Sequence, residues 1–281
     1  MRNQFTQGCI IEDIRSSKYA NIRCKGIVIS ARCDIAQRKI PCVHYLTALN
    51  IYDWMYEVLF ETIVDEMRKK SLDTIKNLAK EKELDFETLL ELGIEKTETI
   101  LLSKCASGKK KEMERIQEAV ASWKRNEIIK QGEVSREEKK EIFKSYGEKK
   151  LFNTIKALYN SNFPKFCFIP EKAYAKSDSA VRGLVVDLQD IQQIDMSMVD
   201  RIINFECDYV IIEDETERRT LNRSFFFENK NDFLIIDSIV ESPWIEYLLQ
   251  LFANSFTRIG VDNADEEKII IHVREFLEAS L

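Results

Sequence analysis

The sequence predicts an α+β protein in which a small β-barrel, built from both ends of the chain, is interrupted by an inserted helical domain and followed by C-terminal helices. Three observations carry this prediction. Short apolar runs typical of strands occur in residues 1–50 and return in residues 163–240. In residues 51–162 there is no proline, and the apolar residues recur at helical spacing. Finally, 44% of the 281 residues are hydrophobic, enough to bury a large core.

The N-terminal segment, residues 1–50, is the first part of the predicted barrel. Its apolar runs are rich in Ile, Val and Tyr, which favour strands, and polar stretches with Ser, Asn, Arg and Lys separate them. The predicted strands are residues 8–11, 26–31 and 41–48.

Residues 51–162 form the predicted helical insertion. Asp85 with Thr88 is typical of a helix start, and Gly93 is a suitable end for that short helix. Ser135 and Glu138 have the spacing of a capping box ahead of another helix. We expect three to five helices in this segment.

The predicted barrel resumes in residues 163–240, and residues 241–281 are predicted to form C-terminal helices. Ser242 is a suitable N-cap for the first of them, with Pro243 at its first helical position. The apolar stripe of that helix is expected to pack on the core, and a partner helix is the alternative. The predicted strands are residues 166–169, 183–188, 209–212 and 233–236, and the last helix covers residues 265–281.

Charge is distributed unevenly along the chain. Residues 1–50 hold 8 Lys and Arg against 3 Asp and Glu, whereas residues 161–281 hold 12 against 23, within a net charge of −6. The two ends should therefore attract each other. A basic N-terminal segment can also bind a phosphate backbone, so nucleic acid stays open as a partner.

The features that the sequence lacks limit where the protein is expected in the cell and which chemistry it is expected to perform. No apolar run approaches the roughly 20 residues that cross a bilayer, and residues 1–15 lack the apolar core of a signal peptide, so we expect a cytoplasmic protein. Seven cysteines without a secretory signal favour reduced thiols over disulfides. No nucleotide-binding loop or common hydrolase motif occurs, and no cofactor is expected.

Two stretches resemble the MazF/PemK family of bacterial toxins, whose fold is a small SH3-like barrel. The first lies within residues 8–47 and contains Arg23-Cys-Lys-Gly-Ile-Val-Ile-Ser; the second is residues 185–195. The chain departs from the family where Gly-Asp has become Gly8-Cys9 and where Arg-Pro has become Arg23-Cys24.

This resemblance implies metal-independent cleavage of RNA, with Arg23 and Thr47 as the catalytic pair. A guanidinium group can bind the scissile phosphate, and a hydroxyl group can position that phosphate or the attacking 2′-OH. Both side chains are then expected at one rim of the barrel. Lys25, Arg32 and Asp34 are the candidate binding residues beside them.

A second resemblance is to uncharacterised prokaryotic proteins that carry Ser-x-x-Cys-Asp after an apolar strand and are loosely linked to conflict or phage-defence loci. Here the motif is residues 30–34, and the C-terminal features of that group match residues 242–260. This resemblance carries no reaction. It favours a binding or regulatory component of a conflict system, with RNA cleavage as the alternative. A protein partner is expected, no membrane is, and RNA and a second copy of the chain stay open.

Four cysteines and His44 crowd the first 44 residues and raise the question of a zinc site. Paired C-x2-C knuckles are absent, so buried thiols on strands are the favoured interpretation and no metal is expected. Cys33 with Asp34 is interpreted as a structural corner in which Asp34 caps the turn after the strand or binds backbone N–H groups, rather than as a thiol nucleophile. The acidic stretch 211–217 is interpreted as the tip of a hairpin. The four cysteines are Cys9, Cys24, Cys33 and Cys42.

Overall fold

A computed structural model describes residues 5–105, 110–132, 134–163, 165–174, 183–204, 206 and 211–257. It divides the chain into two compact units. Residues 1–51 and 156–281 make up one, called here the sheet unit, and residues 52–155 make up the other, the helical unit. The predicted helix over residues 265–281 lies outside the described residues.

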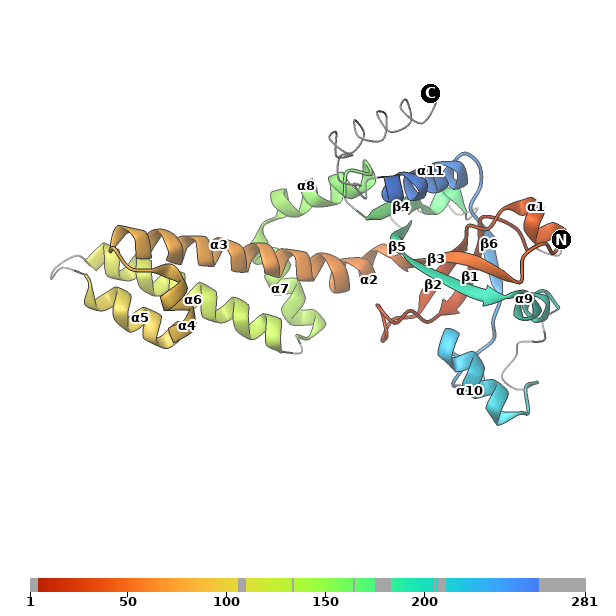
Figure 1. The fold of residues 1–281 in the computed structure, drawn as a ribbon, viewed down its shortest axis with the longest axis horizontal. Helices are drawn as coiled ribbons and strands as arrows, with labels where there is room; N and C mark the ends of the chain where they lie inside the picture. The colour runs from red at the N-terminus through yellow and green to blue at the C-terminus, as the bar shows by residue number, and fades with distance from the viewer. Residues whose placement is uncertain are drawn as a thin grey trace, which may run out of the picture. The chain divides into compact units, whose positions relative to one another are not determined.

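The sheet unit is built on one antiparallel sheet of six strands, curled into a half-barrel (Figure 1). Its strand order is β4-β5-β3-β2-β1-β6. β3 and β5 pair over most of the length of β3, from Cys42 opposite Asp195 to Asn50 opposite Leu184. The prediction that both ends of the chain share one sheet is therefore confirmed. The strands are β1 Cys9–Ile14, β2 Cys24–Val28, β3 Cys42–Asn50, β4 Phe166–Pro170, β5 Gly183–Asp195 and β6 Ile236–Ile239.

Two of the irregularities in the register of this sheet carry most of the charged side chains of its strands. In β1, the register advances three residues from Ile11 to Ile14 while β2 advances two, from Gly26 to Cys24. In β5, residues 187–190 have no partners on β3, because Leu46 lies opposite Ile191 and Ala48 opposite Val186. Such bulges redirect side chains that a regular strand would send to alternating faces.

The core of the sheet unit lies between one face of the sheet and helix α11, Trp244–Thr257. Ile10, Ile27 and Leu46 contribute from three adjacent strands, and Leu248 contributes from the helix. Trp244, Leu248, Leu251 and Phe252 pack as the apolar stripe predicts. Core packing, rather than a free face for a partner helix, is thus confirmed for these side chains.

Several local predictions for the second half of the chain are wrong. β6 begins at Ile236, not at residue 233, because β1 bulges directly after Ile11, which lies opposite Ile236. Residues 211–212 form no strand, and residues 209–210 lie outside the described part of the chain. The acidic stretch starts a helix instead of a hairpin, since Asp214 accepts a hydrogen bond from the backbone N–H of Thr216. Helix α11 begins at Trp244, with Ser242 and Pro243 in the preceding turn.

The described part of the sheet unit also contains four shorter helical elements. They connect the strands or extend from the sheet (Figure 1). They are α1 Arg32–Ala36, the 3-10 helix η2 Glu171–Ala173, α9 Met196–Ile203 and α10 Glu215–Ser224.

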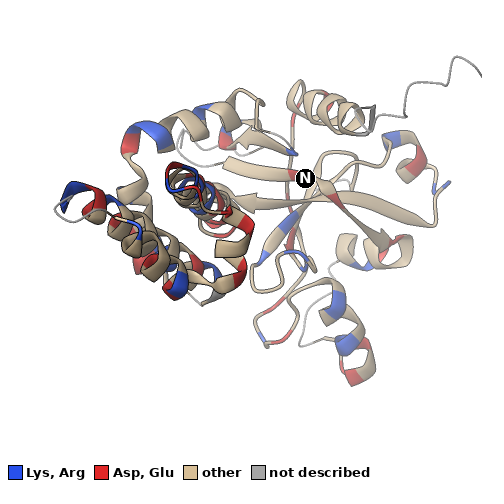
Figure 2. Cartoon of the chain, turned by 60° about the vertical axis from the view of Figure 1, so that its left-hand side comes forward, with Lys and Arg blue, Asp and Glu red and all other residues tan. Residues whose placement is uncertain are grey.

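The helical unit packs around its own apolar core, in which Ile75, Leu101, Ile116 and Trp123 are buried. Both predicted caps are present. Asp85 accepts from the Thr88 N–H at 2.8 Å, and Ser135 with Glu138 forms the capping box. Charged residues of both signs alternate along these helices (Figure 2).

The described residues of this segment hold more helices than the three to five expected, because several are short. The elements are α2 Ile51–Trp54, the π-helix η1 Met55–Leu59, α3 Phe60–Glu81, α4 Phe86–Leu92, α5 Ile94–Ser103, α6 Lys110–Gln131, α7 Arg136–Tyr146 and α8 Glu148–Tyr159. Within the described part of the chain, no helix has the length and apolar character to cross a membrane.

Candidate functional site

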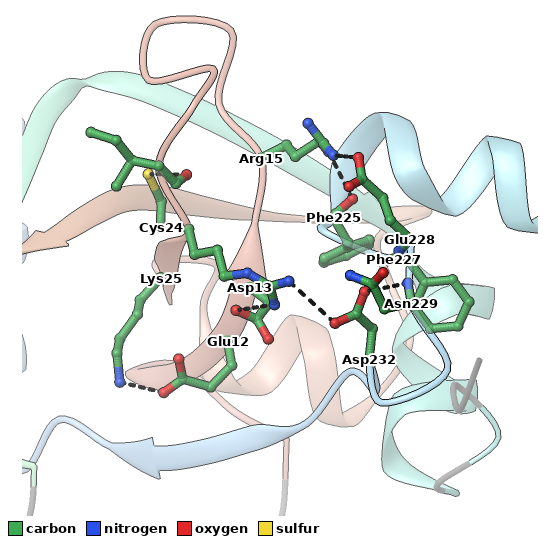
Figure 3. Close-up of polar contacts among 12 residues, drawn as sticks. Glu12, Asp13, Arg15, Cys24, Lys25, Phe225, Phe227, Glu228, Asn229 and Asp232 are labelled. Atoms are coloured by element: carbon green, nitrogen blue, oxygen red, sulfur yellow. Dashed lines mark hydrogen bonds and ion pairs between the residues drawn. The ribbon is translucent and has the colours of Figure 1, made fainter. Parts of the chain in front are cut away.

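Arg23 lies directly before β2, where it contacts two carboxylates of the sheet unit. Its Nη1 is 3.3 Å from Oδ1 of Asp13, and its Nη2 is 3.2 Å from Oδ1 of Asp232 (Figure 3). Asp13 lies in the bulge of β1 and has a positive φ of 55°. The bulge explains how neighbouring acids on one strand both meet basic side chains of the next.

Asp232 is the most enclosed member of this cluster, with 7% of its side chain exposed. Its Oδ2 accepts the backbone N–H groups of Glu228 and Asn229 at 2.8 and 2.7 Å. Burial alone would raise the pKa of Asp232, but these two N–H groups and the Arg23 guanidinium outweigh it and hold that pKa below the usual value. The carboxylate therefore stays ionised and holds the loop ahead of β6 in place.

A second arginine anchors the same loop. The Arg15 guanidinium lies over the ring of Phe226, 4.1 Å from its centroid, and donates hydrogen bonds to the Asn222 side chain and the Phe225 carbonyl at 3.1 and 3.0 Å. It also pairs with Glu228 (Figure 3). The Arg23 guanidinium carbon is 5.3 Å from the centroid of the same Phe226 ring. One aromatic ring is thus bordered by two cations.

Lys25 is paired as well. Its Nζ contacts Glu12 of the β1 bulge (Figure 3). The same Nζ lies 3.4 Å from Asp237 of β6. Burial opposes ionisation of Lys25, but the two carboxylates outweigh it and raise the pKa of its ammonium. Lys25 and Arg23 are two residues apart on the same strand end, so the structure brings these two predicted residues together.

Thr47 occupies a different place. It lies in β3 directly opposite Gly26, has no exposed surface, and its Oγ1 has no hydrogen-bond partner in the described part of the chain. Arg23 is three residues before Gly26, roughly 10 Å along the strand. The structure therefore does not bring Arg23 and Thr47 together at an exposed rim.

Arg32 and Asp34 lie on α1, which follows the opposite end of β2 from Arg23. Arg32 and Cys33 are exposed, and the Cys33 Sγ is 3.5 Å from Oδ1 of Asp34. The expectation that Asp34 caps this turn is wrong, because Asp34 lies inside the first turn and the N-cap is Ala31, which has no capping side chain.

The N-terminal cysteines are not alike. Cys9 and Cys24 are buried on strands, and burial raises the pKa of the Cys9 thiol to about 11. Cys42 is half-buried on β3, while Cys33 is exposed on a helix, so the interpretation as buried strand thiols holds for the first two alone. Across the described residues, His, Cys, Asp and Glu side chains nowhere gather in threes as a metal ion would need.

Sequence reasoning missed a buried polar cluster at the β5 bulge. The Asp187 side chain has no exposed surface, lies 2.5 Å from Lys18 Nζ, and accepts the Tyr19 hydroxyl at 2.7 Å. Asp190 accepts the Ser16 hydroxyl at 2.6 Å. Burial, followed by Asp187, raises the pKa of Tyr19, which stays protonated as the donor. The sequence signal that could have revealed this cluster is Asp187, a charged residue among the apolar residues of the predicted strand 183–188.

Ion pairs join the two ends of the chain, as the charge distribution predicts. Each pairs a basic residue from the first 50 with an acidic residue beyond 160. They are Arg15–Glu228, Lys18–Asp187, Arg23–Asp232, Lys25–Asp237 and Arg38–Asp200. The predicted attraction between the ends is confirmed by these contacts.

Sequence reasoning also missed a pocket of about 650 Å³ in the sheet unit. It is lined by aromatic side chains from the end of α8, from β4 and from α11, together with Glu171 of η2. Compared with known proteins, the chain matches no family model, no curated protein and no solved structure.

Proposed function

We propose that this chain is a binding or regulatory component of a prokaryotic conflict system, of the toxin–antitoxin or phage-defence kind, on a MazF/PemK-like fold with an SH3-like barrel. The observation that carries binding over cleavage is the pairing of Arg23 with both Asp13 and Asp232. A phosphate group that approaches Arg23 would be repelled by the two carboxylates that already pair with the Arg23 guanidinium. The two negative charges in contact with Arg23 oppose the binding of a phosphate there.

The burial of Thr47 supports the same choice. A hydroxyl group that helps position a phosphate or a 2′-OH must reach the substrate within hydrogen-bonding distance. Thr47 has no exposed surface and lies within the sheet, opposite Gly26. Its hydroxyl is therefore better explained as part of the core than as part of a reaction centre.

The assignment to a conflict system is supported by the sequence motif Ser-x-x-Cys-Asp. In the structure this motif runs from the turn after β2 into the start of α1, where Arg32 and Cys33 are exposed. An exposed motif of this kind suits recognition of a protein partner better than a role in the core.

RNA cleavage remains the second candidate because the Arg23 side chain is 47% exposed. A solvent-facing guanidinium can reach a phosphate, and exchanging its contact with the partly exposed Asp13 costs little because such ion pairs contribute only about 0–1 kcal/mol. In this case Arg23 would act without Thr47.

The two candidates are separated by incubating the full chain with single-stranded RNA in the presence of a chelator. The samples are wild type, Arg23→Ala and, as a matched control, Arg219→Ala, which removes an exposed arginine of α10. We expect intact RNA in all three. Cleavage by wild type and by Arg219→Ala that is lost in Arg23→Ala would contradict the binding proposal and establish the nuclease.

The conflict-system role is tested by expressing the chain together with its neighbouring genes in a bacterial host. We expect deletion of the chain to change host growth or the efficiency of phage plating, and Arg32→Glu to reproduce that change in a protein that still folds. Lys130→Glu, which changes an exposed cation of the helical unit, is the control. Unchanged growth and plating after deletion would reject the role.

A further inference from the structure

The aromatic rings that line the pocket of the sheet unit differ in orientation. Trp244 and Tyr247, on the first turn of α11, have ring planes at 84° with centroids 6.3 Å apart. Tyr159 of α8 and Phe168 of β4 stack with centroids 4.0 Å apart. All four side chains line one pocket. Its volume, about 650 Å³, is within the range of small-molecule sites.

A carboxylate oxygen is buried at the same pocket. Glu171 lines it, and its Oε2 is buried without a hydrogen-bond partner among the described residues. Because water does not reach this oxygen, the negative charge of the carboxylate is poorly solvated and its field at the pocket is weakly screened, which favours a positively charged ligand there. Glu171 is the first residue of η2 and directly follows β4, so the sheet sets the position of its backbone.

The other charged side chain at the pocket is Lys172, which is exposed. Its ammonium is accessible to solvent, where salt screens its field, whereas the Glu171 oxygen is shielded from water. Among the described lining residues, the buried charge is therefore negative and the rest of the wall is mainly aromatic.

Aromatic faces set at an angle, combined with one carboxylate, form a chemical environment that suits an organic cation. The negative faces of Trp and Tyr rings attract ammonium groups, and quaternary ammonium groups benefit most because they lose little hydration on entering an apolar site. A metal ion would find too few oxygen ligands among these residues, and an anion would lie beside the Glu171 carboxylate.

We infer that this pocket binds a free small organic cation, an alkylated ammonium group carried on an apolar body, between Trp244, Tyr247 and Glu171. The apolar body would contact Tyr159 and Phe168. This inference rests on the pocket alone and does not depend on the proposed role in a conflict system.

Calorimetric titration of the full chain with benzyltrimethylammonium tests the inference. Neopentylbenzene, its uncharged isostere, and phenylacetate, an aromatic anion, are the comparison probes. We expect the cation to bind at least tenfold more tightly than either comparison probe, equivalent to about 1.4 kcal/mol. Failure of the cation to bind at about 10 mM, or equal affinity for its uncharged isostere, would overturn the inference.

Variants locate the binding. Glu171→Gln keeps the shape of the side chain and removes its charge, so affinity for the cation should fall about tenfold while affinity for the isostere stays unchanged. Trp244→Leu should weaken both. Glu246→Gln, on an exposed position of α11, is the matched control and should bind as wild type does. Circular dichroism confirms that each variant is folded. Equal cation affinity in wild type and Glu171→Gln would remove the assigned site.

A trimethyllysine peptide distinguishes the source of the ammonium group. Weaker binding of the peptide than of benzyltrimethylammonium supports a free small molecule. Tighter binding of the peptide would overturn that assignment in favour of a modified side chain on a partner protein.

Discussion

Arg23 and Asp232 are 209 residues apart in the sequence, yet the guanidinium Nη2 of one lies 3.2 Å from the carboxylate Oδ1 of the other. The second oxygen of Asp232 accepts two backbone N–H groups from its own loop. The pair therefore ties the start of β2 to the loop that leads into β6.

Asp232→Asn should destabilise the sheet unit by about 2 kcal/mol at neutral pH, because an amide cannot replace a carboxylate that accepts from Arg23 and from two N–H groups. The pKa of Asp232 is lowered in the folded protein, so its stabilisation is present above the unfolded pKa and is lost as pH falls through the folded one. The difference between wild type and variant should shrink between pH 7 and about pH 3, as measured by urea denaturation.

Asp237→Asn is the control for this experiment, because Asp237 is 41% exposed and lies 3.4 Å from Lys25. Its cost should stay below about 1 kcal/mol. An Asp232→Asn loss that is the same at both pH values would show that the charge of Asp232 does not matter.

Gly26→Ala should destabilise the sheet by about 1–3 kcal/mol through overpacking. A Cβ at this position would lie 2.7 Å from Cδ2 of Tyr45, closer than real contacts allow. Tyr45→Ala removes that ring and should leave Gly26→Ala with little further effect. Thermal unfolding of the two single variants and the double variant measures this coupling, and additive losses would contradict it.

Asp187→Ala should cost about 2–3 kcal/mol, because it leaves the buried Tyr19 hydroxyl without its acceptor and removes the partner of Lys18. Tyr19→Phe should cost less, about 1 kcal/mol, since it removes both the donor and its need for a partner. A double-mutant cycle by chemical denaturation tests this, and the Tyr19→Phe cost should nearly vanish in the Asp187→Ala background. Losses that simply add would show that the two groups do not interact.

Ser135→Ala should lower the stability of the helical unit by about 1 kcal/mol, because it removes the acceptor for the Glu138 N–H at the start of α7. Hydrogen exchange at the first turn of α7 should increase in the variant. Ser103→Ala, at an exposed helix end where the hydroxyl only donates to the Ile100 carbonyl, serves as the control. Equal effects of the two changes would argue against the cap.

Local signals in the sequence predicted local structure well. The caps at Asp85 and Ser135 were found because each acceptor and its donor are three residues apart and need no other part of the chain. By contrast, the apolar run at residues 233–236 was misplaced as a strand. Its regular pairing depends on β1, which bulges directly after Ile11, and Ile11 lies opposite Ile236.

The candidate site shows the same difference between features that local sequence predicts and features that depend on distant parts of the chain. The resemblance to the MazF/PemK family implied a role for Arg23, and Lys25, Arg32 and Asp34 were candidate binding residues. The charge counts predicted attraction between the basic start and the acidic end of the chain. The periodicity of the strands does not reveal their order in the sheet. The burial of Thr47 and the position of the β5 bulge depend on that order, so the sequence could not predict them. Glu171 carried no signal because an isolated acid after a strand is ordinary.

The sequence by itself determined the α+β class, the sharing of one sheet by both ends of the chain, the separate run of helices and the sign of the charge at each end. Apolar periodicity, caps and charge counts carry that information because they act over a few residues or through simple attraction. Only the tertiary structure decided which carboxylates meet Arg23 and which aromatic rings gather around Glu171. Those contacts depend on strand register and bulges, where a shift of one residue moves a side chain to the opposite face.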